Sequence, residues 1–537
     1  MRIGEKTRRT RVERTGPFRG RTISVVGDLS GDEQRYLYAL AREIKNTIRS
    51  GGDPHRFRIS DQDYQTYLIF LENSTRTRES FRNAAEFHGC RVNMFDAATS
   101  SFAKNESLSD AVKMLVGYAP ESCFVIRSGL EGVCRWLDSS VGAYCEAAGF
   151  PKPAFLNAGD GKHEHPTQEF LDEFTFLEQL GGDDSRIHIA LVGDLWHGRT
   201  VHSKAEGLRV FKEVSVDLVA PELLSMPPVY VERMKAAGFE VRAFESLDEY
   251  LVSGRVAPIW YYTRLQLERM GERVLDRAAE LRRAVTFRPD MMSLLPEGTR
   301  FYHPLPRDRK APVIPTFLDE LPLNGWDAQS ANGYYVRIAL LGMVAGALGG
   351  DFRGEPKEPL RFEEDFVTEA PVSARVRPEY KVGIKPVENG IVIDHVAAGR
   401  PVREIWDTLD KIRRILGLDV RSSHGVYHSN AGPDIYKGIL SLPDILSFDR
   451  RDLKKLGAIA PGCTLNLIKD SRVLKKYRLA MPPRIYNFEQ ISCKNEACVS
   501  HPSHQEGAPA RFRRTGERTF TCLYCDREHE FGEIWDL

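Results

Sequence analysis

Residues 67–88 read YLIFLENSTRTRESFRNAAEFH, and this stretch decides the fold class of the chain around it. The apolar run at residues 67–71 is typical of a buried strand, and the run at residues 79–88 is typical of an amphipathic helix. A short polar segment, residues 74–78, joins them. A strand that passes through a short loop into a helix is the unit from which parallel α/β sheets are built.

The same alternation continues on both sides of this stretch. Helical runs at residues 33–48 and 167–180 flank it, and a second series of strands and helices begins with the apolar run at residues 187–194. We therefore predict an α/β protein with two similar parallel-sheet lobes, residues 21–182 and 183–350, and a cleft between them.

Beyond residue 350 the pattern changes. Residues 351–378 are rich in Pro, Glu and Arg without hydrophobic periodicity, which is typical of a linker. We predict that an α+β domain follows over residues 379–480 and a cysteine-bearing module over residues 481–537. The arginine-rich residues 1–20 have no apolar core, so we predict a flexible basic arm rather than a secretory signal.

The composition excludes several classes of protein. The chain has 537 residues, 42% hydrophobic and 28% charged, which excludes a disordered or fibrous protein. Lys plus Arg and Asp plus Glu both number 75, so no net charge draws the protein to nucleic acid or to an anionic membrane. The longest apolar run, residues 338–350, falls short of the ~20 residues that span a bilayer, so we predict a buried helix there.

The segment between the first strand and its helix has the chemistry of an anion receptor. Three hydroxyls and two guanidinia precede a helix, whose N-terminal N–H groups and dipole also attract anions. A helix cap needs only one hydroxyl and remains the simpler alternative. The predicted phosphate ligands are Ser74, Thr75, Arg76 and Thr77.

The sequence His163-Glu164-His165-Pro166-Thr167-Gln168 precedes another predicted helix. Two histidines that lie two residues apart do not match zinc-type helical spacing, so we expect no metal there. His165 can instead polarise a carbonyl oxygen, with Gln168 as a further polar contact. A purely structural histidine is the alternative.

The second lobe carries its candidates after strand-like runs. Gly193-Asp194 ends one such run without the G-x-G-x-x-G spacing of a dinucleotide fold, so we expect no nicotinamide cofactor. Arg199 follows, where open α/β sheets bind ligands. Arg264 and Gln266 lie two residues apart and share one side of an extended segment. Two prolines stiffen the loop at residues 303–307.

Taken together, these segments resemble the catalytic chain of aspartate carbamoyltransferase in order, over about residues 20–350. The family motifs S-T-R-T-R, H-P-T-Q, T-R-x-Q and H-P-L-P-R correspond to residues 74–78, 165–168, 263–266 and 303–307. The related ornithine enzymes usually show H-C-L-P in the last motif, so the sequence favours aspartate. A carbamoyltransferase for another amine, such as ornithine, is the runner-up.

The resemblance implies a reaction in which carbamoyl phosphate binds first, with Arg127 reaching both its phosphate and its carbonyl. L-Aspartate then binds through its carboxylates, and its amine attacks the carbonyl carbon and expels phosphate, which is the committed step of pyrimidine synthesis. No metal or organic cofactor is implied for this chemistry. The implied catalytic residues are Arg76, Thr77, Lys104, Arg127 and His165. The implied substrate contacts add Ser74, Thr75, Ser100, Gln168, Arg199, Arg264, Gln266, Pro304 and Leu305.

Residues 100–106 resemble a loop that, in this family, enters the active site of a neighbouring chain. This implies that Ser100 and Lys104 complete the site of a second copy. It also implies a homo-oligomer, a catalytic trimer or a multiple of it. A solvated surface lysine is the alternative reading of Lys104.

Four cysteines form two pairs near the C-terminus, with C-x4-C and C-x2-C spacing. This pattern predicts a closed, structural Zn²⁺ site with four thiolate ligands. The other cysteines are scattered, which is typical of a reducing, cytoplasmic compartment. A nucleic-acid-binding zinc ribbon on an inactive α/β scaffold is a rival, and the balanced charge weighs against it. The predicted ligands are Cys493, Cys498, Cys522 and Cys525.

The C-terminal third resembles the regulatory chain of the same enzyme, whose zinc domain has the same cysteine pairs. Residues 390–395 resemble the opening of its nucleotide-binding domain, with ATP, CTP or UTP as candidate effectors. A second lysine expected shortly after Lys437 is Ser441 here. A domain kept only for assembly is the alternative. We interpret the chain as a natural fusion of catalytic and regulatory chains, with effector contacts from Asp394, His395 and Lys476.

Overall fold

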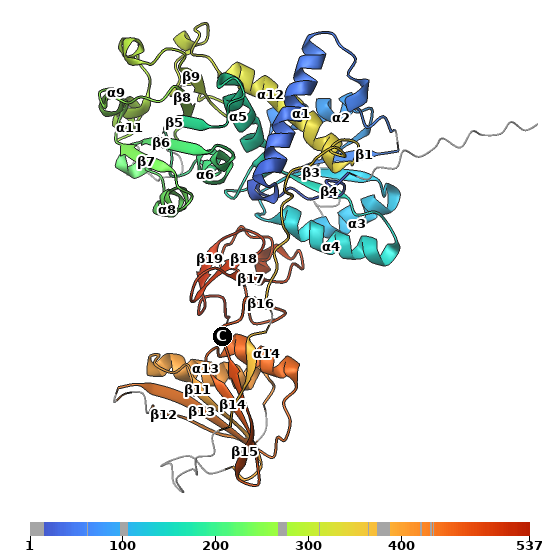
Figure 1. Ribbon diagram of the computed structural model, residues 1–537, viewed down its shortest axis with the longest axis vertical. Helices are drawn as coiled ribbons and strands as arrows, with labels where there is room; N and C mark the ends of the chain where they lie inside the picture. The colour runs from blue at the N-terminus through green and yellow to red at the C-terminus, as the bar shows by residue number, and fades with distance from the viewer. Residues whose placement is uncertain are drawn as a thin grey trace, which may run out of the picture. The chain divides into compact units, whose positions relative to one another are not determined.

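The structure is a computed structural model, and the chain divides into two compact units, Met1–Glu358 and Pro359–Leu537 (Figure 1). The residues that the structure describes are 16–61, 63–96, 106–266, 277–310, 312–363, 365–372, 387–418, 421–429, 432 and 434–536.

The first unit contains two parallel sheets, which confirms the predicted fold class. Their strand orders are β2-β1-β3-β4 and β7-β6-β5-β8-β9. β3 and β4 are buried along almost their whole length, as expected for parallel strands covered on both faces. The strands are β1 Gln65–Phe70, β2 Arg91–Asp96, β3 Ser122–Ser128, β4 Ala154–Asp160, β5 Arg186–Val192, β6 Glu213–Val219, β7 Glu240–Phe244, β8 Ile259–Tyr262 and β9 Arg300–Tyr302.

Helices connect these strands, and local sequence sets several of their ends. Ser30 caps the helix that begins at Gly31 by accepting a hydrogen bond from the N–H of Glu33, while the Glu33 carboxylate accepts from the N–H of Ser30. The helices are α1 Gly31–Arg49, α2 Thr75–Phe87, α3 Leu108–Tyr118, α4 Val133–Ala148, α5 Pro166–Gln179, α6 Arg199–His202, α7 Lys204–Gly207, α8 Pro228–Ala236, α9 Leu247–Leu251, α11 Ala278–Val285 and α12 Trp326–Val344.

The helix that carries the predicted phosphate motif begins earlier than the sequence predicted. α2 starts at Thr75 rather than at Glu79, so the motif occupies the first helical turn. Ser74 is the N-cap residue, but its side chain makes no capping hydrogen bond. The N–H groups of this turn therefore lack the side-chain cap that was the simpler explanation of the motif.

α12 returns from the second lobe to the first. The sequence predicts a buried helix over residues 338–350, within the range of the second lobe, whereas α12 spans Trp326–Val344 and packs against α1, α2 and α5. Figure 1 shows α5 and α12 lying between the two sheets. A helix that is apolar on most of its surface must be covered on most of its surface, and only the junction of the lobes offers that cover.

The second unit contains antiparallel sheets, in the orders β10-β15-β14-β11-β13-β12 and β16-β17-β18-β19. α13 and α14 pack against the larger sheet, as the predicted α+β class requires. Its elements are β10 Val367–Ala370, β11 Gly390–Val396, α13 Val402–Ile415, β12 Ser423–His428, β13 Tyr436–Pro443, α14 Arg450–Ile459, β14 Thr464–Lys469, β15 Arg472–Leu479, β16 Arg484–Tyr486, β17 Arg511–Arg514, β18 Thr519–Cys522 and β19 Glu528–Glu530.

Part of the predicted linker is built into the larger sheet. β10 lies within residues 351–378 and pairs antiparallel with β15, from Val367 opposite Leu479 to Ala370 opposite Lys476. Four residues are too few to show hydrophobic periodicity, so this edge strand could not be predicted from the sequence. Among the helices of the described ranges, none has the combination of length and hydropathy that crossing a bilayer requires.

Candidate functional site

Predicted site residues of both lobes lie at the carboxyl ends of parallel strands. In the first sheet, α2 follows β1, Arg127 lies near the end of β3, and His165 follows β4. In the second sheet, Arg199 follows β5 as the first residue of α6, and Arg264 follows β8. Ligands of open α/β sheets bind at this edge, because strand ends and helix N-termini meet there.

His165 and Thr77 meet at the core of the site. The Nε2 atom of His165 lies 3.4 Å from the Thr77 hydroxyl, and both residues are buried. The Nδ1 atom lies 3.4 Å from the Thr167 hydroxyl, which accepts a hydrogen bond from Arg337 at 3.4 Å. Because Arg337 donates to this oxygen, Thr167 is free to donate to Nδ1, which favours the tautomer with its proton on Nε2.

The surroundings keep His165 neutral. Burial lowers the pKa of His165 well below its usual value, and the guanidinia of Arg199, Arg127 and Arg337 lower it further. A neutral imidazole with its proton on Nε2 can donate a hydrogen bond to a carbonyl oxygen. The positive groups around it would favour negative charge on that oxygen.

Arg337 is a site residue that sequence reasoning missed. It lies in α12, almost fully buried, and donates a 2.8 Å hydrogen bond to the Ser80 hydroxyl. Burial lowers the pKa of Arg337 to about 9. A lone arginine within an apolar helix was the only available signal, and it does not indicate which site the arginine serves.

Gly159 brings an arginine from each lobe together. Its φ of +113° is unfavourable for other residues, and a Cβ atom there would lie 2.6 Å from Arg127 Nη1 and 3.3 Å from Arg199 Nη2. Arg127 donates to the carbonyl of Ala158 at 2.8 Å, and Arg199 donates to the carbonyl of Gly161. Burial, and next the charge of Arg199, lower the pKa of Arg127 to about 10.

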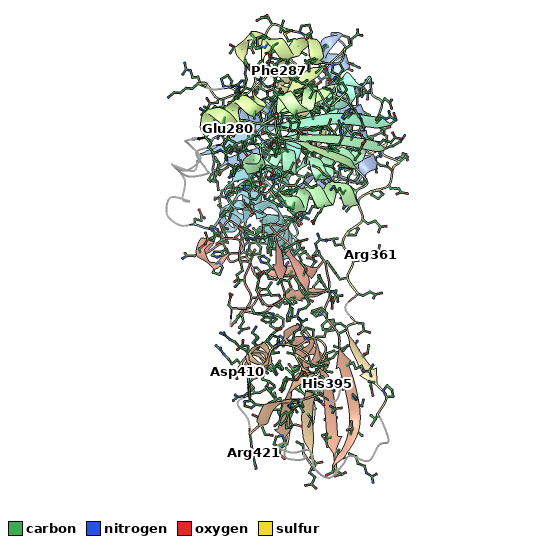
Figure 2. The ribbon with its side chains drawn as sticks, turned by 90° about the vertical axis from the view of Figure 1, so that its left-hand side faces the viewer. Glu280, Phe287, Arg361, His395, Asp410 and Arg421 are labelled. Carbon is green, nitrogen blue, oxygen red and sulfur yellow. The ribbon has the colours of Figure 1, made fainter. Side chains whose placement is uncertain are left out.

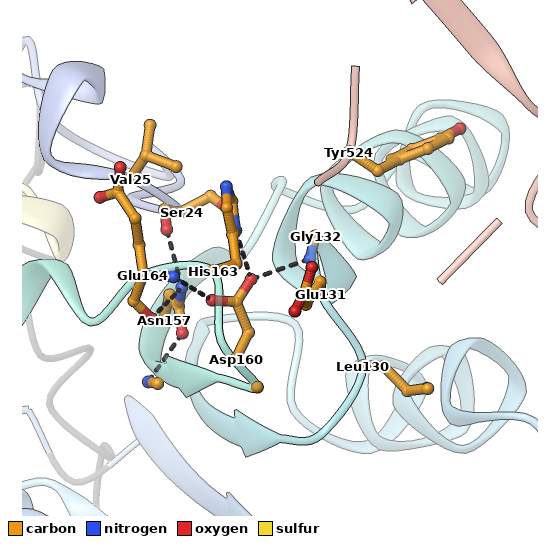
Figure 3. Close-up of polar contacts among 12 residues, drawn as sticks. Ser24, Val25, Leu130, Glu131, Gly132, Asn157, Asp160, His163, Glu164 and Tyr524 are labelled. Carbon is orange, nitrogen blue, oxygen red and sulfur yellow. Dashed lines mark hydrogen bonds and ion pairs between the residues drawn. The ribbon is translucent and has the colours of Figure 1, made fainter. Parts of the chain in front are cut away.

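A buried carboxylate organises the loop that leads to His165 (Figure 3). Asp160 accepts hydrogen bonds from the N–H of Gly132 at 2.8 Å, from the N–H of Glu164 at 3.0 Å and from His163 Nδ1 at 2.9 Å. Asn157 donates to the carbonyl of Ser24 at 2.8 Å. These bonds fix the loop on both sides and so fix the entry of the chain into α5.

In the second lobe, Asp194 holds the predicted aspartate-binding segment. Its buried carboxylate accepts from the N–H of Gln266 at 3.1 Å, and its carbonyl accepts from the Thr263 hydroxyl at 3.1 Å. Gln266 also donates to the carbonyl of His197 at 3.3 Å. Gly193 permits this approach, because a Cβ atom there would lie 2.4 Å from the Thr263 carbonyl oxygen.

The proline-rich loop after β9 is anchored at both ends. The N–H of His303 donates to Gln329 Oε1 at 2.9 Å, and the N–H of Leu305 donates to His303 Nδ1 at 2.8 Å. Arg307 forms a bidentate ion pair with Asp319 at 2.6 and 3.0 Å, so it holds the loop rather than lying free in solvent.

Charges from both lobes converge on His303. Burial, and next the charges of Arg307, Arg76 and Arg264, lower the pKa of His303 to about 3. Arg76 belongs to the first lobe and Arg264 to the second. The two predicted substrate-binding arginines therefore approach one imidazole, which lies beside Pro304 and Leu305.

The remaining predicted site residues of the first unit differ in exposure and in contacts. Thr75 and Arg76 are exposed, and Ser74 is half-buried. Gln168 donates a 2.8 Å hydrogen bond to Asp172. Ser100 and Lys104 lie outside the described residues.

In the second unit, the predicted effector residues share one face of the larger sheet. The Asp394 carboxylate pairs with Lys437 Nζ at 2.7 Å, and His395, near the end of β11 (Figure 2), lies 3.3 Å from the Thr464 hydroxyl. Lys476 lies opposite Asn466 of β14, which lies opposite Val392 of β11. Because Val392 and Asp394 are two residues apart on one strand, Lys476 lies on the same face as Asp394. The pairing of Asp394 with Lys437 was not predicted.

The four predicted metal ligands form a compact buried cluster. Their sulfur atoms all lie within 4.8 Å of one another, with distances of 3.6 Å between Cys493 and Cys525 and 3.8 Å between Cys498 and Cys522. A tetrahedral ion with metal–sulfur bonds of about 2.3 Å requires sulfur–sulfur separations of about 3.8 Å, so the cluster fits such an ion. His529 Nε2 lies 3.4 Å from the Cys493 sulfur.

Three protein-family models match the chain. Residues 21–178 match the aspartate/ornithine carbamoyltransferase carbamoyl-phosphate-binding domain. Residues 382–480 match the allosteric domain of the aspartate carbamoyltransferase regulatory chain, and residues 483–535 match the metal-binding domain of that chain.

Two relatives align with nearly the whole chain. A protein named PyrBI from Thermotoga maritima is 53% identical over 527 residues, which cover 97% of this chain and 99% of the relative. The PyrBI protein of Treponema denticola is 51% identical over 527 residues, with 96% and 98% covered.

A solved structure resembles the first part of the chain. It is the aspartate transcarbamoylase of Trypanosoma cruzi in complex with N-(phosphonacetyl)-L-aspartic acid. It superposes with a TM-score of 0.52 at 29% identity and covers 62% of this chain and 97% of that one. The same Trypanosoma cruzi enzyme in complex with carbamoyl phosphate and aspartate gives a TM-score of 0.51 at 28% identity.

Proposed function

The chain belongs to the aspartate carbamoyltransferase family as a fusion of catalytic and regulatory chains, and on this premise we propose which of its residues bind each substrate and which promote the reaction. It is an aspartate carbamoyltransferase. The carbamoyl group of carbamoyl phosphate passes to the amine of L-aspartate, giving N-carbamoyl-L-aspartate and phosphate. This reaction is the committed step of pyrimidine synthesis, and it takes place in the cytoplasm, where the thiols of the chain stay reduced.

The phosphate of carbamoyl phosphate binds at the N-terminus of α2. Ser74, Thr75, Arg76 and Thr77 supply hydroxyls, a guanidinium and N–H groups that no side chain caps. Arg127 reaches the same phosphate from β3. The positive groups at this site repel one another, and a bound anion offsets that repulsion. Binding an anion therefore explains why this exposed motif contains so many hydrogen-bond donors.

The carbonyl of carbamoyl phosphate lies between His165 and Thr77. The neutral imidazole donates from Nε2, and Arg127 donates from the side, so charge that develops on the oxygen meets fixed donors. Gln168 already donates its Nε2 to Asp172, so its Oε1 is left to accept from the carbamoyl amino group. The backbone carbonyls of Pro304 and Leu305 accept from the same amino group.

L-Aspartate binds through Arg199, Arg264 and Gln266, whose guanidinia and amide suit two carboxylates. Its neutral amine attacks the carbonyl carbon and forms a C–N bond. The tetrahedral intermediate then breaks the C–O bond to phosphate, and the departing phosphate accepts the proton that the amine loses. Holding both reactants in register can supply about 7 to 11 kcal/mol of the rate enhancement.

The observation that carries this assignment is the approach of Arg127 and Arg199 over Gly159, which joins a phosphate ligand of one lobe to an aspartate ligand of the other. A direct assay of carbamoylaspartate formation from carbamoyl phosphate and L-aspartate tests it. We expect Arg76→Ala and His165→Ala to lower kcat/KM by about 100-fold or more while the protein stays folded. Near-normal turnover by both variants, or turnover with ornithine in place of aspartate, would contradict it.

Ser100 and Lys104 complete the site of a neighbouring copy, so the catalytic form is a trimer or a multiple of it. This proposal rests on the resemblance of residues 100–106 to the loop shared between chains in this family. Mixing a Lys104→Ala variant with an Arg264→Ala variant should restore part of the activity, because some sites in the hybrid would hold neither substitution. No recovery in the mixture would argue against a shared site.

The four cysteines hold Zn²⁺, which stabilises the C-terminal module and takes no part in the reaction. Four thiolates at tetrahedral separations favour this ion, and a site with four protein ligands leaves no position for substrate. Metal analysis of the purified protein, with one zinc per chain expected, tests the identity.

The regulatory domain binds a nucleotide on the sheet face that carries Asp394, His395 and Lys476. Adding ATP, CTP or UTP in turn to the carbamoylaspartate assay should change the apparent affinity for aspartate for at least one of them. If no nucleotide changes the rate, and none binds at millimolar concentration, the regulatory domain has no effector site and acts only in the assembly of the oligomer.

A further inference from the structure

Lys204 is a fully buried cation at the junction of the two lobes. It opens α7 in the second lobe, and its Nζ atom lies 2.7 Å from Glu169 Oε2 and 2.9 Å from Asp172 Oδ2, both on α5 of the first lobe. Glu173 lies at 3.9 Å. The aromatic ring of Tyr261 covers Lys204, with its centroid 4.5 Å from Nζ.

The charges of this cluster are nearly balanced. Burial alone would lower the pKa of Lys204, but the carboxylates of Asp172 and Glu169 outweigh it and raise that pKa, so the lysine is charged. Burial, and next the carboxylate of Glu169, raise the pKa of Glu173 well above its usual value, so Glu173 is protonated at neutral pH. Lys204 therefore faces two carboxylates that contact it directly and neutralises the charge of one, and burial raises the pKa of the Glu169 carboxyl as well.

Stability does not explain why such a cluster exists. Buried ion pairs seldom stabilise a fold more than apolar residues of the same volume would, because desolvation offsets most of their attraction. What the cluster does provide is orientation, since Lys204 holds Asp172 Oδ2 and leaves Oδ1 facing the opposite way.

Two amides converge on that second oxygen. Asp172 Oδ1 accepts from Gln168 Nε2 at 2.8 Å and from Gln329 Nε2 at 2.6 Å. Gln329 in turn accepts from the N–H of His303 through its Oε1. The path thus runs from Lys204 to a proposed ligand of the carbamoyl group and to the start of the loop that carries Pro304 and Leu305.

An ionised carboxylate fixes which end of each amide faces it. A carboxylate only accepts hydrogen bonds, so both glutamines must present Nε2 to Asp172 and Oε1 elsewhere. For Gln168 this leaves an acceptor for the carbamoyl amino group, and for Gln329 it leaves an acceptor for His303. A flipped Gln168 would instead point its own N–H groups at that amino group.

We propose that Lys204 is a positioning residue, which holds Asp172 so that Gln168 and the His303 loop both present acceptors to the amino group of carbamoyl phosphate. This inference rests on the proposed role of Gln168. It makes the second lobe, through α7, responsible for the orientation of a ligand in the first lobe. Lys204 also lies five positions after Arg199, so one segment serves both substrates.

The test compares two phosphate esters that differ at one group. Acetyl phosphate carries a methyl group where carbamoyl phosphate carries the amino group, so it gains nothing from an acceptor on Gln168. In Lys204→Met, the KM for carbamoyl phosphate should rise about tenfold, as for the loss of one hydrogen bond. The inhibition constant of acetyl phosphate, measured in competition, should stay within about twofold of the wild-type value.

Lys45→Met is the matched control. Lys45 is also buried and contacts α5, with its Nζ 2.5 Å from Glu178 and 2.8 Å from Asn332 Oδ1, but none of these residues reaches the proposed site. We expect lower thermal stability and an unchanged KM for carbamoyl phosphate. If Lys204→Met does not fold, the double variant Lys204→Met/Glu169→Gln removes one charge of each sign and takes its place.

Gln168→Ala separates this inference from the proposed function. It should raise the KM for carbamoyl phosphate by itself, and Lys204→Met should raise that KM less in its presence than in the wild type, because part of the Lys204 effect passes through Gln168. If Gln168→Ala has no effect, the proposed role of Gln168 fails and this inference fails with it. If Gln168→Ala has its effect but folded Lys204→Met does not, or if Lys204→Met weakens both phosphate esters equally, the positioning role alone is overturned.

Discussion

In the first unit, the proposed active site draws on residues from Ser74 to Leu305, whereas in the second unit 32 positions separate the first and last of the four predicted metal ligands. The catalytic site depends on side chains that meet only after two sheets have formed. The cysteine cluster depends on two short turns and one sheet. The active site should therefore lose activity when packing is disturbed far from the substrates. The cysteine cluster should instead lose its structure when a single metal–thiolate bond is lost.

The largest effect should follow removal of the metal. Structural zinc contributes on the order of 10 kcal/mol to small zinc modules, so chelation or Cys498→Ser should unfold the sheet from β16 to β19. Carbamoylaspartate formation should persist, because every proposed catalytic residue lies in the first unit. Hydrogen exchange followed by mass spectrometry, with peptides from both units, checks this. Unchanged protection of residues 484–530 in the metal-free protein would contradict it.

A smaller loss should follow one added methyl group at the meeting point of the lobes. In Gly159→Ala the new Cβ would lie 2.6 Å from Arg127 Nη1, so the guanidinium must move and kcat/KM should fall about 100-fold. Gly149→Ala is the control, since its φ is +71° but nothing lies within 4 Å of the added atom. It should cost about 1 kcal/mol of stability and leave kcat/KM unchanged. Equal effects of both variants on kcat/KM would argue that strain, not the arginine, is responsible.

Acid should destabilise the first unit through its buried histidines. The pKa values of His165 and His303 are lowered as described, and burial lowers the pKa of His88 to about 4. The unfolded imidazole, with a pKa of about 6.5, takes up a proton that the folded one excludes, so stability falls as the pH drops from 7 to 5. His88 alone should account for about 2 kcal/mol of that loss.

Denaturant titrations at pH 7 and pH 5 measure this slope. His88→Gln is the comparison variant, because a neutral amide can still donate to the Ile338 carbonyl and accept from the N–H of Ile59. Its stability should fall less between the two pH values than that of the wild type. Equal slopes for the two proteins would show that His88 does not take up its proton on unfolding.

The smallest effect concerns the metal site. His529→Phe removes the nitrogen that lies 3.4 Å from the Cys493 sulfur, while the ring can keep its contact with Phe512. Loss of such an outer contact should speed metal transfer to a coloured chelator about tenfold. His428→Phe, in β12 of the other sheet, is the control and should leave the transfer rate unchanged. Equal rates for the wild type and His529→Phe would show that this contact does not affect the metal.

Much of the site could be predicted from short segments. The hydroxyls and guanidinia at residues 74–78, His165 before its helix, and the two cysteine pairs each carry their chemistry within a few positions. Asp160, by contrast, has no role that the sequence predicts, and its role appears only through its contacts with Gly132, His163 and Glu164. The sequence predicts that α2 starts at Glu79, whereas it starts at Thr75. Strand and helix propensities do not show that an anion-binding segment forms the first turn of a helix.

The sequence by itself determined the α/β alternation of the first unit, the family to which its motifs correspond and the ligands of the metal cluster. These features follow from local periodicity and from residue types at fixed spacing. Only the tertiary structure decided that α12 packs on the first lobe, that Arg127 and Arg199 meet over Gly159 and that Lys204 contacts Asp172. Such contacts join residues that are distant in the chain, and their energies depend on burial, which no local pattern encodes.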